Sequence, residues 1–378
     1  MTAKMKPRDR VLAALNHHPV DRIPIDLGGT PNSTICIGAY ERLKAFLGVE
    51  VPTRELSKSF ETAYVDETVL RRLPVDTRAV YARSPARSCT RWLDERTYVD
   101  EWGITYHRPN NWHQYDIVAH PLAEATLADL ERYPWPDVDD ETRYAGLADE
   151  ARALREGTDF AICGCTLSTS IFDRCWMLRG MEQFMVDLLT DRPFATGLLQ
   201  KVSEVQYRRH ECFLAEVGPY LDVIMIADDM GTQKGPLIRP ETYRELVKPI
   251  HREYVQVIKR LSPAKVLMHS CGSIVELIED YIDIGVDALN PMQVEAAGMA
   301  PRALKQRFGG RIAFWGGIDS QRLLPRAAPE QVRQAVRDML SIMGLEGGYV
   351  LGAVHNIQDD VPPENVWAML DEAASITR

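Results

Sequence analysis

Residues 265–272 read KVLMHSCG, a short apolar run that ends in histidine, serine and cysteine. The run is continuous rather than alternating, which is typical of a β-strand buried on both faces of a parallel sheet. Such strands occur in α/β folds, and the residues that follow them lie at the carboxyl edge of the sheet. This stretch therefore predicts both the fold class and the position of a site.

Seven further stretches have the same buried-strand pattern. With 265–269, the predicted strands are residues 22–27, 78–82, 159–163, 222–227, 286–290, 312–315 and 348–352. Amphipathic helical patterns lie between them, at residues 240–260, 273–284, 301–308, 329–343 and 362–373. The alternation predicts an α/β protein, and eight strands favour one (β/α)8 TIM barrel domain over residues 1–378. A dinucleotide-binding sheet is disfavoured because residues 28–31, GGTP, do not match G-x-G-x-x-G.

The composition restricts the class of protein. The 378 residues carry a net charge of −10 without a basic stripe, so we expect no nucleic-acid partner. No run of about 18 apolar residues occurs, and no apolar segment follows the charged N-terminus, so we expect no membrane span, no secretory signal and a cytoplasmic location. The seven cysteines, an odd number, predict reduced thiols.

One region interrupts the alternation. Residues 83–136 are rich in aromatic and charged side chains, and the aromatic ones include Trp92, Tyr98, Trp102, Tyr106 and Trp112. The pattern predicts a β-hairpin insertion after the second strand, covering one mouth of the barrel. Its role stays open between a packed excursion, a lid and a contact within a homodimer.

Polar residues follow nearly every predicted strand. Side chains at the C-terminal ends of barrel strands converge on one mouth, so these residues are the candidates for chemistry. We assign Asp228 and Glu295 as candidate catalytic residues, because a carboxyl group there can act as general acid or base. Since Asp228 and Asp229 are adjacent, we expect one to face the mouth and the other to cap or pair locally. The candidate substrate-binding residues are Asp26, Asn32, Gln293, Trp315 and Asp319.

His269 and Cys271 form the sharpest motif. Two positions apart on an extended segment, their side chains project to the same side and can reach one ion. Imidazole and thiolate are zinc ligands, and three protein ligands with one open position are typical of a catalytic zinc. We assign His355, after the eighth strand, as the third ligand; the alternatives are Cys163, Cys165 and Glu295.

Several stretches share a pattern with one known group of proteins. They are ADDMGTQKGP at residues 227–236, HSCG at 269–272, NPMQ at 290–293, FWGGID at 314–319 and HNIQ at 355–358, with KPRDRVLAAL at 6–15 and DRIP at 21–24. Together they resemble the uroporphyrinogen decarboxylase superfamily. The resemblance covers nearly the whole chain, is weakest in residues 83–136, and implies a TIM barrel.

That superfamily contains cofactor-free decarboxylases of haem synthesis and corrinoid-linked methyltransferases, whose zinc is bound by a His-x-Cys pair and a late cysteine. Two features favour the methyltransferase branch. His269 and Cys271 match the pair, and residues 27–33, LGGTPNS, lack the arginines with which the decarboxylases bind a substrate of many carboxylates. Where the late cysteine is expected the chain has His355, so the ligands are either all three residues or the pair alone.

The resemblance implies methyl transfer between a small thiol, methoxy or methylamine compound and a corrinoid such as methylcobalamin. Zinc would acidify a bound thiol or polarise the methylated atom. No Asp-x-His-x-x-Gly pattern, typical of corrinoid-binding domains, occurs in the chain, so we expect the corrinoid on a partner protein. The alternatives are a cofactor-free decarboxylase of the uroporphyrinogen type and a barrel that binds a ligand without catalysis.

Overall fold

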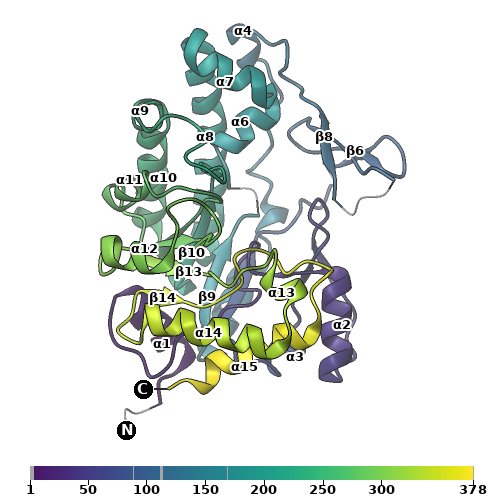
Figure 1. Cartoon of the computed structure of the whole chain (residues 1–378). Helices are drawn as coiled ribbons and strands as arrows, with labels where there is room; N and C mark the ends of the chain where they lie inside the picture. Colours follow the sequence, from purple (N-terminus) through teal and green to yellow (C-terminus); the bar gives the residue numbers. More distant parts are fainter. Residues whose placement is uncertain (1–3, 88, 111–113, 168, 378) are drawn as a thin grey trace.

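A curled parallel sheet forms the centre of the protein. The computed structural model describes residues 4–87, 89–110, 114–167 and 169–377. Seven parallel strands lie in the order β4-β9-β10-β11-β12-β13-β14, with helices on the outside, in a TIM-barrel-like arrangement (Figure 1). They are β4 (Thr77–Tyr81), β9 (Ala161–Cys165), β10 (Val223–Ala227), β11 (Lys265–His269), β12 (Ala288–Asn290), β13 (Ala313–Trp315) and β14 (Tyr349–Val350). The predicted α/β class is confirmed.

The predicted first strand, residues 22–27, is not a regular strand, so the expectation of eight such strands was wrong. Pro24 has no N–H group to donate, and the segment therefore cannot continue a β-ladder. It still lies between the two ends of the sheet. Leu351 N donates to Pro24 O at 2.8 Å, and Asp76 N donates to Ile25 O at 2.8 Å. We call residues 22–27 the seam, because they connect β14 to the start of β4.

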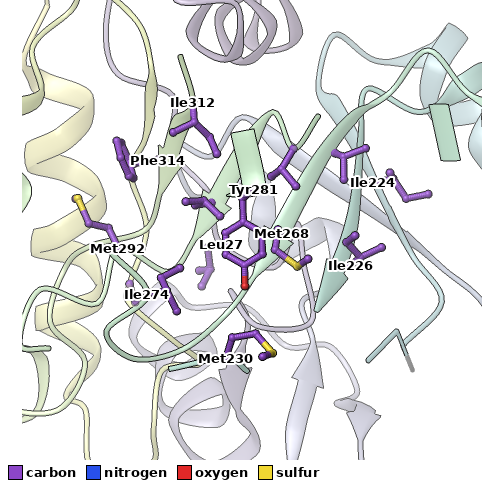
Figure 2. Close-up of a cluster of buried hydrophobic side chains, with 14 of the residues drawn as sticks. Leu27, Ile224, Ile226, Met230, Met268, Ile274, Tyr281, Met292, Ile312 and Phe314 are labelled. Carbon is purple, nitrogen blue, oxygen red and sulfur yellow. The ribbon is translucent and has the colours of Figure 1, made fainter. Parts of the chain in front are cut away.

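Alternate side chains of the strands belong to two different cores, as the period of two of a β-strand requires. The first core fills the interior of the curled sheet; its strand residues are Ala79, Tyr81, Ala161, Cys163, Cys165, Val223, Met225, Leu267, Ala288, Ala313, Trp315 and Val350. The second core lies between the sheet and the helices. Figure 2 shows part of it, where Tyr281 of a covering helix lies among Ile226, Met268 and Phe314.

Helix α1 (Pro7–Leu15) closes the amino end of the sheet. Val11 and Leu15 belong to the interior core. Beside them, Arg10 is only 2% exposed and forms an ion pair of 2.6 Å with Asp76, which also pairs with Arg22 at 2.7 Å. This end is therefore closed by buried packing and charge, and any cavity must open at the carboxyl ends of the strands.

Further helices surround the sheet, some in contact with its strands and some packed on other helices. They are α2 (Ile37–Leu47), α3 (Glu67–Leu70), α4 (Leu127–Leu130), α5 (Leu147–Gly157), α6 (Phe172–Arg179), α7 (Met181–Thr190), α8 (Arg192–Val217), α9 (Pro240–Thr242), α10 (Lys248–Leu261), α11 (Ile278–Asp283), α12 (Pro301–Phe308), α13 (Leu323–Arg326), α14 (Pro329–Met343) and α15 (Pro363–Ser375), with single turns η1 (Glu141–Arg143) and η2 (Gly218–Tyr220). Among the described residues, no helix is long and apolar enough to cross a membrane.

The helix predicted over residues 240–260 is interrupted. A π-helical turn, η3 (Tyr243–Val247), separates α9 from α10. Pro249 lies in the first turn of α10. Proline cannot donate the backbone hydrogen bond of a regular α-helix, which accounts for the widened turn just before it.

Two small antiparallel sheets complete the fold. β1 (Ile35–Cys36), β3 (Thr62–Tyr64) and β2 (Arg54–Ser57) form one, in the order β1-β3-β2. β5 (Arg91–Trp92), β6 (Thr97–Val99), β7 (Thr105–His107) and β8 (Asp116–Ala119) form the other, within the region predicted as a hairpin insertion (Figure 1). Its status as an insertion stays a prediction, and Trp112 lies outside the described residues.

Candidate metal centre

Three potential ligands meet at the carboxyl end of β11. His269 is the last residue of this strand, Cys271 follows two positions later, and His355 lies beyond β14. One ligand atom from each lies within 4.8 Å of the others. His269 Nε2 is 3.4 Å from Cys271 Sγ, and the two imidazole rings are 5.5 Å apart between centroids. We call these three residues the His–Cys–His cluster.

The loop after His269 is held by close backbone contacts. Gly272 has a φ of +85°, a conformation that favours glycine. A Cβ atom there would also lie 2.6 Å from the carbonyl oxygen of Gly231, so only glycine fits. Gly272 N donates to Gln293 Oε1 at 2.7 Å, and Cys271 N donates to Asp229 Oδ1 at 2.8 Å. These contacts fix the position of the Cys271 thiol relative to His269.

Asn290, at the end of β12, orients the His269 ring. His269 Nδ1 lies 2.5 Å from Asn290 Oδ1, which is an acceptor only, so Nδ1 donates its proton and Nε2 presents a lone pair to the cluster. Asn290 Nδ2 in turn donates to the backbone oxygen of Trp315 at 3.3 Å. A hydrogen-bonded partner of this kind on the far nitrogen is the usual support of a metal-binding histidine.

Asn32 shows that the two imidazoles converge. Its Nδ2 atom lies 3.1 Å from His269 Nε2 and 3.2 Å from His355 Nε2. An amide nitrogen can only donate, so both ring nitrogens direct lone pairs towards the same point. Lone pairs directed at one point are what a metal ion requires of its ligands.

The electrostatics of the cluster also fit a cation. Burial, and then the neighbouring His269, lower the pKa of His355 to about 4, so its ring is neutral near pH 7. Burial and the Asp229 carboxylate raise the pKa of the Cys271 thiol well above its usual range. A thiolate at this position therefore needs positive charge beside it, which a divalent metal ion supplies.

A cavity of about 540 Å³ opens beside the cluster. His269 and His355 line it together with Asn32. Two carboxylates, Asp173 of α6 and Asp229, also line it; burial, and then repulsion from Asp228, raise the pKa of Asp173 well above the usual range. The remaining lining residues are mostly apolar and include Phe60, Leu167, Met177, Met181, Met225 and Leu237. The cavity thus offers acid–base groups and apolar walls around the cluster.

Both candidate catalytic residues lie away from this cavity. Asp228 is 1% exposed, accepts backbone N–H bonds at the start of α6, and lies 2.9 Å from His251 Nε2. Its carboxylate is therefore used as a helix cap, and its neighbour Asp229 lies at the cluster instead. Glu295 is exposed on the surface, 3.6 Å from Arg322, because its loop turns outward after β12. Glu295 therefore does not supply a ligand to this cluster.

The five candidate substrate-binding residues separate into three groups. Asn32 alone lines the cavity. Asp26 and Trp315 form a buried pair, with Trp315 Nε1 donating to Asp26 Oδ2 at 2.8 Å. Gln293 and Asp319 have structural contacts. Gln293 accepts from the N–H group of Gly272 in the loop after Cys271. Asp319 accepts from the N–H groups of residues 321–323 at the start of α13.

Sequence reasoning missed three residues that the structure brings to the cluster or cavity. The sequence contains a signal for two of them, because Asn290 ends a predicted strand and Asp229 follows shortly after another. A sequence cannot show, however, which of two adjacent aspartates faces inward. Asp173 had none, because it lies in α6 and follows no strand end. The alternative ligands Cys163 and Cys165 are buried in the interior core and are not members of the cluster.

Known proteins are similar to this chain in sequence and in fold. Residues 114–376 match the family model described as uroporphyrinogen decarboxylase (URO-D). The chain is 28% identical to the uroporphyrinogen decarboxylase of Alkalilimnicola ehrlichii, an alignment that covers 96% of this chain and 92% of that protein. It is 26% identical to the methylated-thiol–coenzyme M methyltransferase of Methanosarcina mazei, over 66% of this chain and 63% of that protein. A solved methyltransferase from Methanosarcina mazei has the same fold, with a TM-score of 0.65, 18% identity and 98% of both chains covered.

Proposed function

The chain belongs to the uroporphyrinogen decarboxylase (URO-D) family, and from this premise we propose that it is a zinc-dependent methyltransferase. It moves a methyl group between a small thiol, methoxy or methylamine compound and a corrinoid that a partner protein carries. The similarity to a methylated-thiol methyltransferase supports this branch of the family. The observation that carries the proposal is the His–Cys–His cluster.

The donor set of the cluster fits zinc. Two imidazole nitrogens and one thiolate are ligands that zinc prefers, and three protein ligands leave a position for substrate. When bound, zinc would acidify a thiol substrate or polarise the methylated oxygen or nitrogen. His269, Cys271 and His355 would hold the ion, and Asn290 would keep the His269 ring in the productive tautomer.

The carboxylates of the cavity supply the acid–base chemistry. A thiol that becomes a nucleophile loses a proton, and an oxygen or nitrogen that loses its methyl group gains one. Asp229 lies next to the cluster, and Asp173 lines the same cavity with a raised pKa, which favours its protonated form. We therefore assign proton transfer to Asp173 and Asp229, in place of Asp228 and Glu295.

The apolar rim of the cavity supports docking of a corrinoid protein. Phe60, Leu167 and Met181 line the cavity and are 52%, 40% and 44% exposed. Exposed apolar side chains gathered at the mouth of a site are a common feature of protein contacts. The chain has no Asp-x-His-x-x-Gly pattern of its own, so the corrinoid would enter from outside.

A cofactor-free decarboxylase is the second candidate. The similarity to uroporphyrinogen decarboxylases covers more of the chain, and two buried arginines near the cavity, Arg143 and Arg209, suit a substrate with carboxylates. Incubation with uroporphyrinogen separates the two functions. Release of CO2 by metal-free protein would support the decarboxylase and exclude the methyltransferase proposal.

Metal analysis tests the proposal directly. We expect purified protein, supplied with zinc and desalted, to retain about one zinc per chain. His269→Ala, Cys271→Ala and His355→Ala should each reduce this amount, whereas His18→Ala and Cys212→Ala, which change residues outside the cluster, should not. Protein that retains no zinc would contradict the proposal.

An activity assay completes the test. Free methylcobalamin and a small thiol replace the partner-bound corrinoid and the natural substrate, and loss of the methylcobalamin spectrum reports methyl transfer. The wild-type protein should accelerate this reaction, and the three ligand variants should not.

A further inference from the structure

A second cavity, of about 400 Å³, adjoins the first. Leu56, Ser57, Leu167 and Arg174 line both cavities, so the two share a wall. The second cavity lies between the carboxyl side of the barrel and the sheet β5–β8, from which Tyr98 and Tyr106 contribute aromatic rings. The two cavities are therefore adjacent, on either side of these four residues.

The lining of the second cavity is positively charged. Among the described residues, its charged side chains are the cations Lys58, Arg83, Arg143, Arg174 and Arg209 and the anions Asp100 and Glu101. The Glu101 carboxylate pairs with Arg143 at 2.5 Å and with Arg209 at 3.0 Å, and Asp100 pairs with Arg174 at 3.4 Å. Within the described lining, the buried guanidinium groups of Arg143 and Arg209 thus share the single Glu101 carboxylate, and an uncompensated buried charge is unfavourable. An added anion would balance it.

Two hydrogen-bond donors in this lining also lack acceptors. Within the described part of the chain, Trp102 Nε1 and Arg209 Nε are buried and have no hydrogen-bond partner. Both residues are nearly inaccessible to solvent, at 1% and 4% exposed. Buried N–H groups are almost always paired in folded proteins, so these two donors of lining residues stay unsatisfied in the free protein and are candidates for an acceptor that a ligand brings.

The aromatic side chains favour an organic anion over a small inorganic one. The guanidinium carbons of Arg174 and Arg209 lie 5.0 Å and 5.9 Å from the centre of the Trp102 ring. Tyr98 and Tyr106 stack at 5.0 Å between ring centres. The cations are therefore held against flat apolar surfaces, which suit a planar ligand that ends in a carboxylate, the group that arginine binds in bidentate geometry.

We propose that the second cavity binds a carboxylate of the small-molecule substrate, while the methyl-bearing end of the same molecule reaches the His–Cys–His cluster across the shared wall. This inference rests on the proposed function for the identity of the reacting end. The carboxylate is the group by which the substrate is recognised, and it remains on the product.

A matched pair of probes tests the charge. Isothermal titration calorimetry on the full chain compares 3-methoxybenzoate with 3-methoxybenzamide, which has the same shape without the charge. The benzoate should bind at least about tenfold more tightly, the effect of one charge-assisted hydrogen bond. Equal affinities would overturn the proposal.

Variants test the residues. Arg209→Gln and Trp102→Phe should each reduce the preference for the benzoate to within about threefold, because each removes one donor of the second cavity. Arg252→Gln removes a surface charge that pairs with Asp283 and should leave the preference unchanged. Melting curves identify any variant that fails to fold, and Trp102→Phe keeps most of the buried ring. A preference that survives in both folded variants would overturn the assignment.

Two further measurements identify the anion and separate this inference from the proposed methyltransferase function. Inorganic phosphate that bound more tightly than 3-methoxybenzoate would overturn the choice of carboxylate. His269→Ala should lose zinc but keep the preference for the benzoate, which supports a separate anion site. Protein that binds zinc but does not distinguish the probes would refute only this inference, whereas protein that distinguishes them without binding zinc would refute only the methyltransferase.

Discussion

Replacing Asn290 with leucine would show how strongly zinc affinity depends on a residue outside the ligand set. Leucine has the same number and branching of side-chain heavy atoms as asparagine, so it is the apolar residue that comes nearest to the asparagine shape at the end of β12. The substitution removes Oδ1, which accepts the His269 Nδ1 proton at 2.5 Å. The ring is then free to rotate or to move its proton to Nε2, and either change removes the lone pair that faces the cluster.

The size of the effect follows from burial. Loss of a partner that orients a metal-binding histidine weakens metal affinity about 10–100-fold, equivalent to about 1.4–2.8 kcal/mol. His269 is 3% exposed and Asn290 is 1% exposed, so bulk water cannot replace the lost acceptor. We therefore expect the upper part of this range for Asn290→Leu.

Zinc affinity is measured by competition with a fluorescent chelator. Asn290→Asp keeps the acceptor oxygen and should bind zinc within a few-fold of the wild type. Asn365→Leu is the matched control: this buried amide donates to the backbone oxygens of Leu324 and Ala327, neither of which belongs to the cluster. It should lower the melting temperature but not the zinc affinity.

Two results would refute this reasoning. If Asn290→Leu binds zinc within threefold of the wild type, the orientation of His269 does not depend on Oδ1. If Asn365→Leu weakens zinc binding equally, then the effect reflects general destabilisation of the fold and not the hydrogen bond to His269.

Three other variants test the remaining parts of the structure. Asp76→Asn should lower the free energy of unfolding, measured in urea, by about 3–5 kcal/mol, because Arg10 and Arg22 lose a buried partner charge. A decrease of less than about 1 kcal/mol, the value of a surface ion pair, would contradict this. Burial lowers the pKa of His210 to about 3, so this residue should contribute a fall in stability of about 1.4 kcal/mol per pH unit as the pH drops from 6.5 towards 3, and His210→Phe should reduce the slope by that amount. Gly272→Ala should weaken zinc binding at least about tenfold, because the added Cβ atom would collide with the backbone of Gly231 and displace the loop that carries Cys271. Gly310→Ala, which has a similar φ but open space around the Cβ position, should leave the zinc affinity unchanged.

The sequence predicted the regular part of the fold well. Seven of the eight proposed strands are present, because a strand buried on both faces needs a continuous apolar run, and the helices that begin at Pro301 and Pro329 have the predicted bounds. The strand predicted at the seam is absent because Pro24 prevents a continuous β-ladder, although the apolar residues of the seam have the pattern of a strand. The four strands of β5–β8 were expected as a hairpin, since short strands carry little periodic signal.

The candidate site was predicted less completely. His269, Cys271 and His355 meet as expected, because the carboxyl ends of the strands of such a sheet converge on one mouth. Which of Asp228 and Asp229 lies at the cluster depends on which carboxylate the start of α6 takes as its cap, and the structure gives that position to Asp228. That contact joins residues more than 50 positions apart in the sequence, and a local pattern contains no information about it.

The seam also determines when the cluster can assemble. Asn32 follows the seam closely, and it contacts His355 across 323 positions of sequence. A growing chain on the ribosome, which has not yet made residue 355, has only His269 and Cys271 to offer a metal ion. The three ligands come together only once β14 and the residues after it have joined the sheet beside the seam. If the cluster holds zinc as proposed, an unfinished chain should bind the ion weakly, because it offers two ligands.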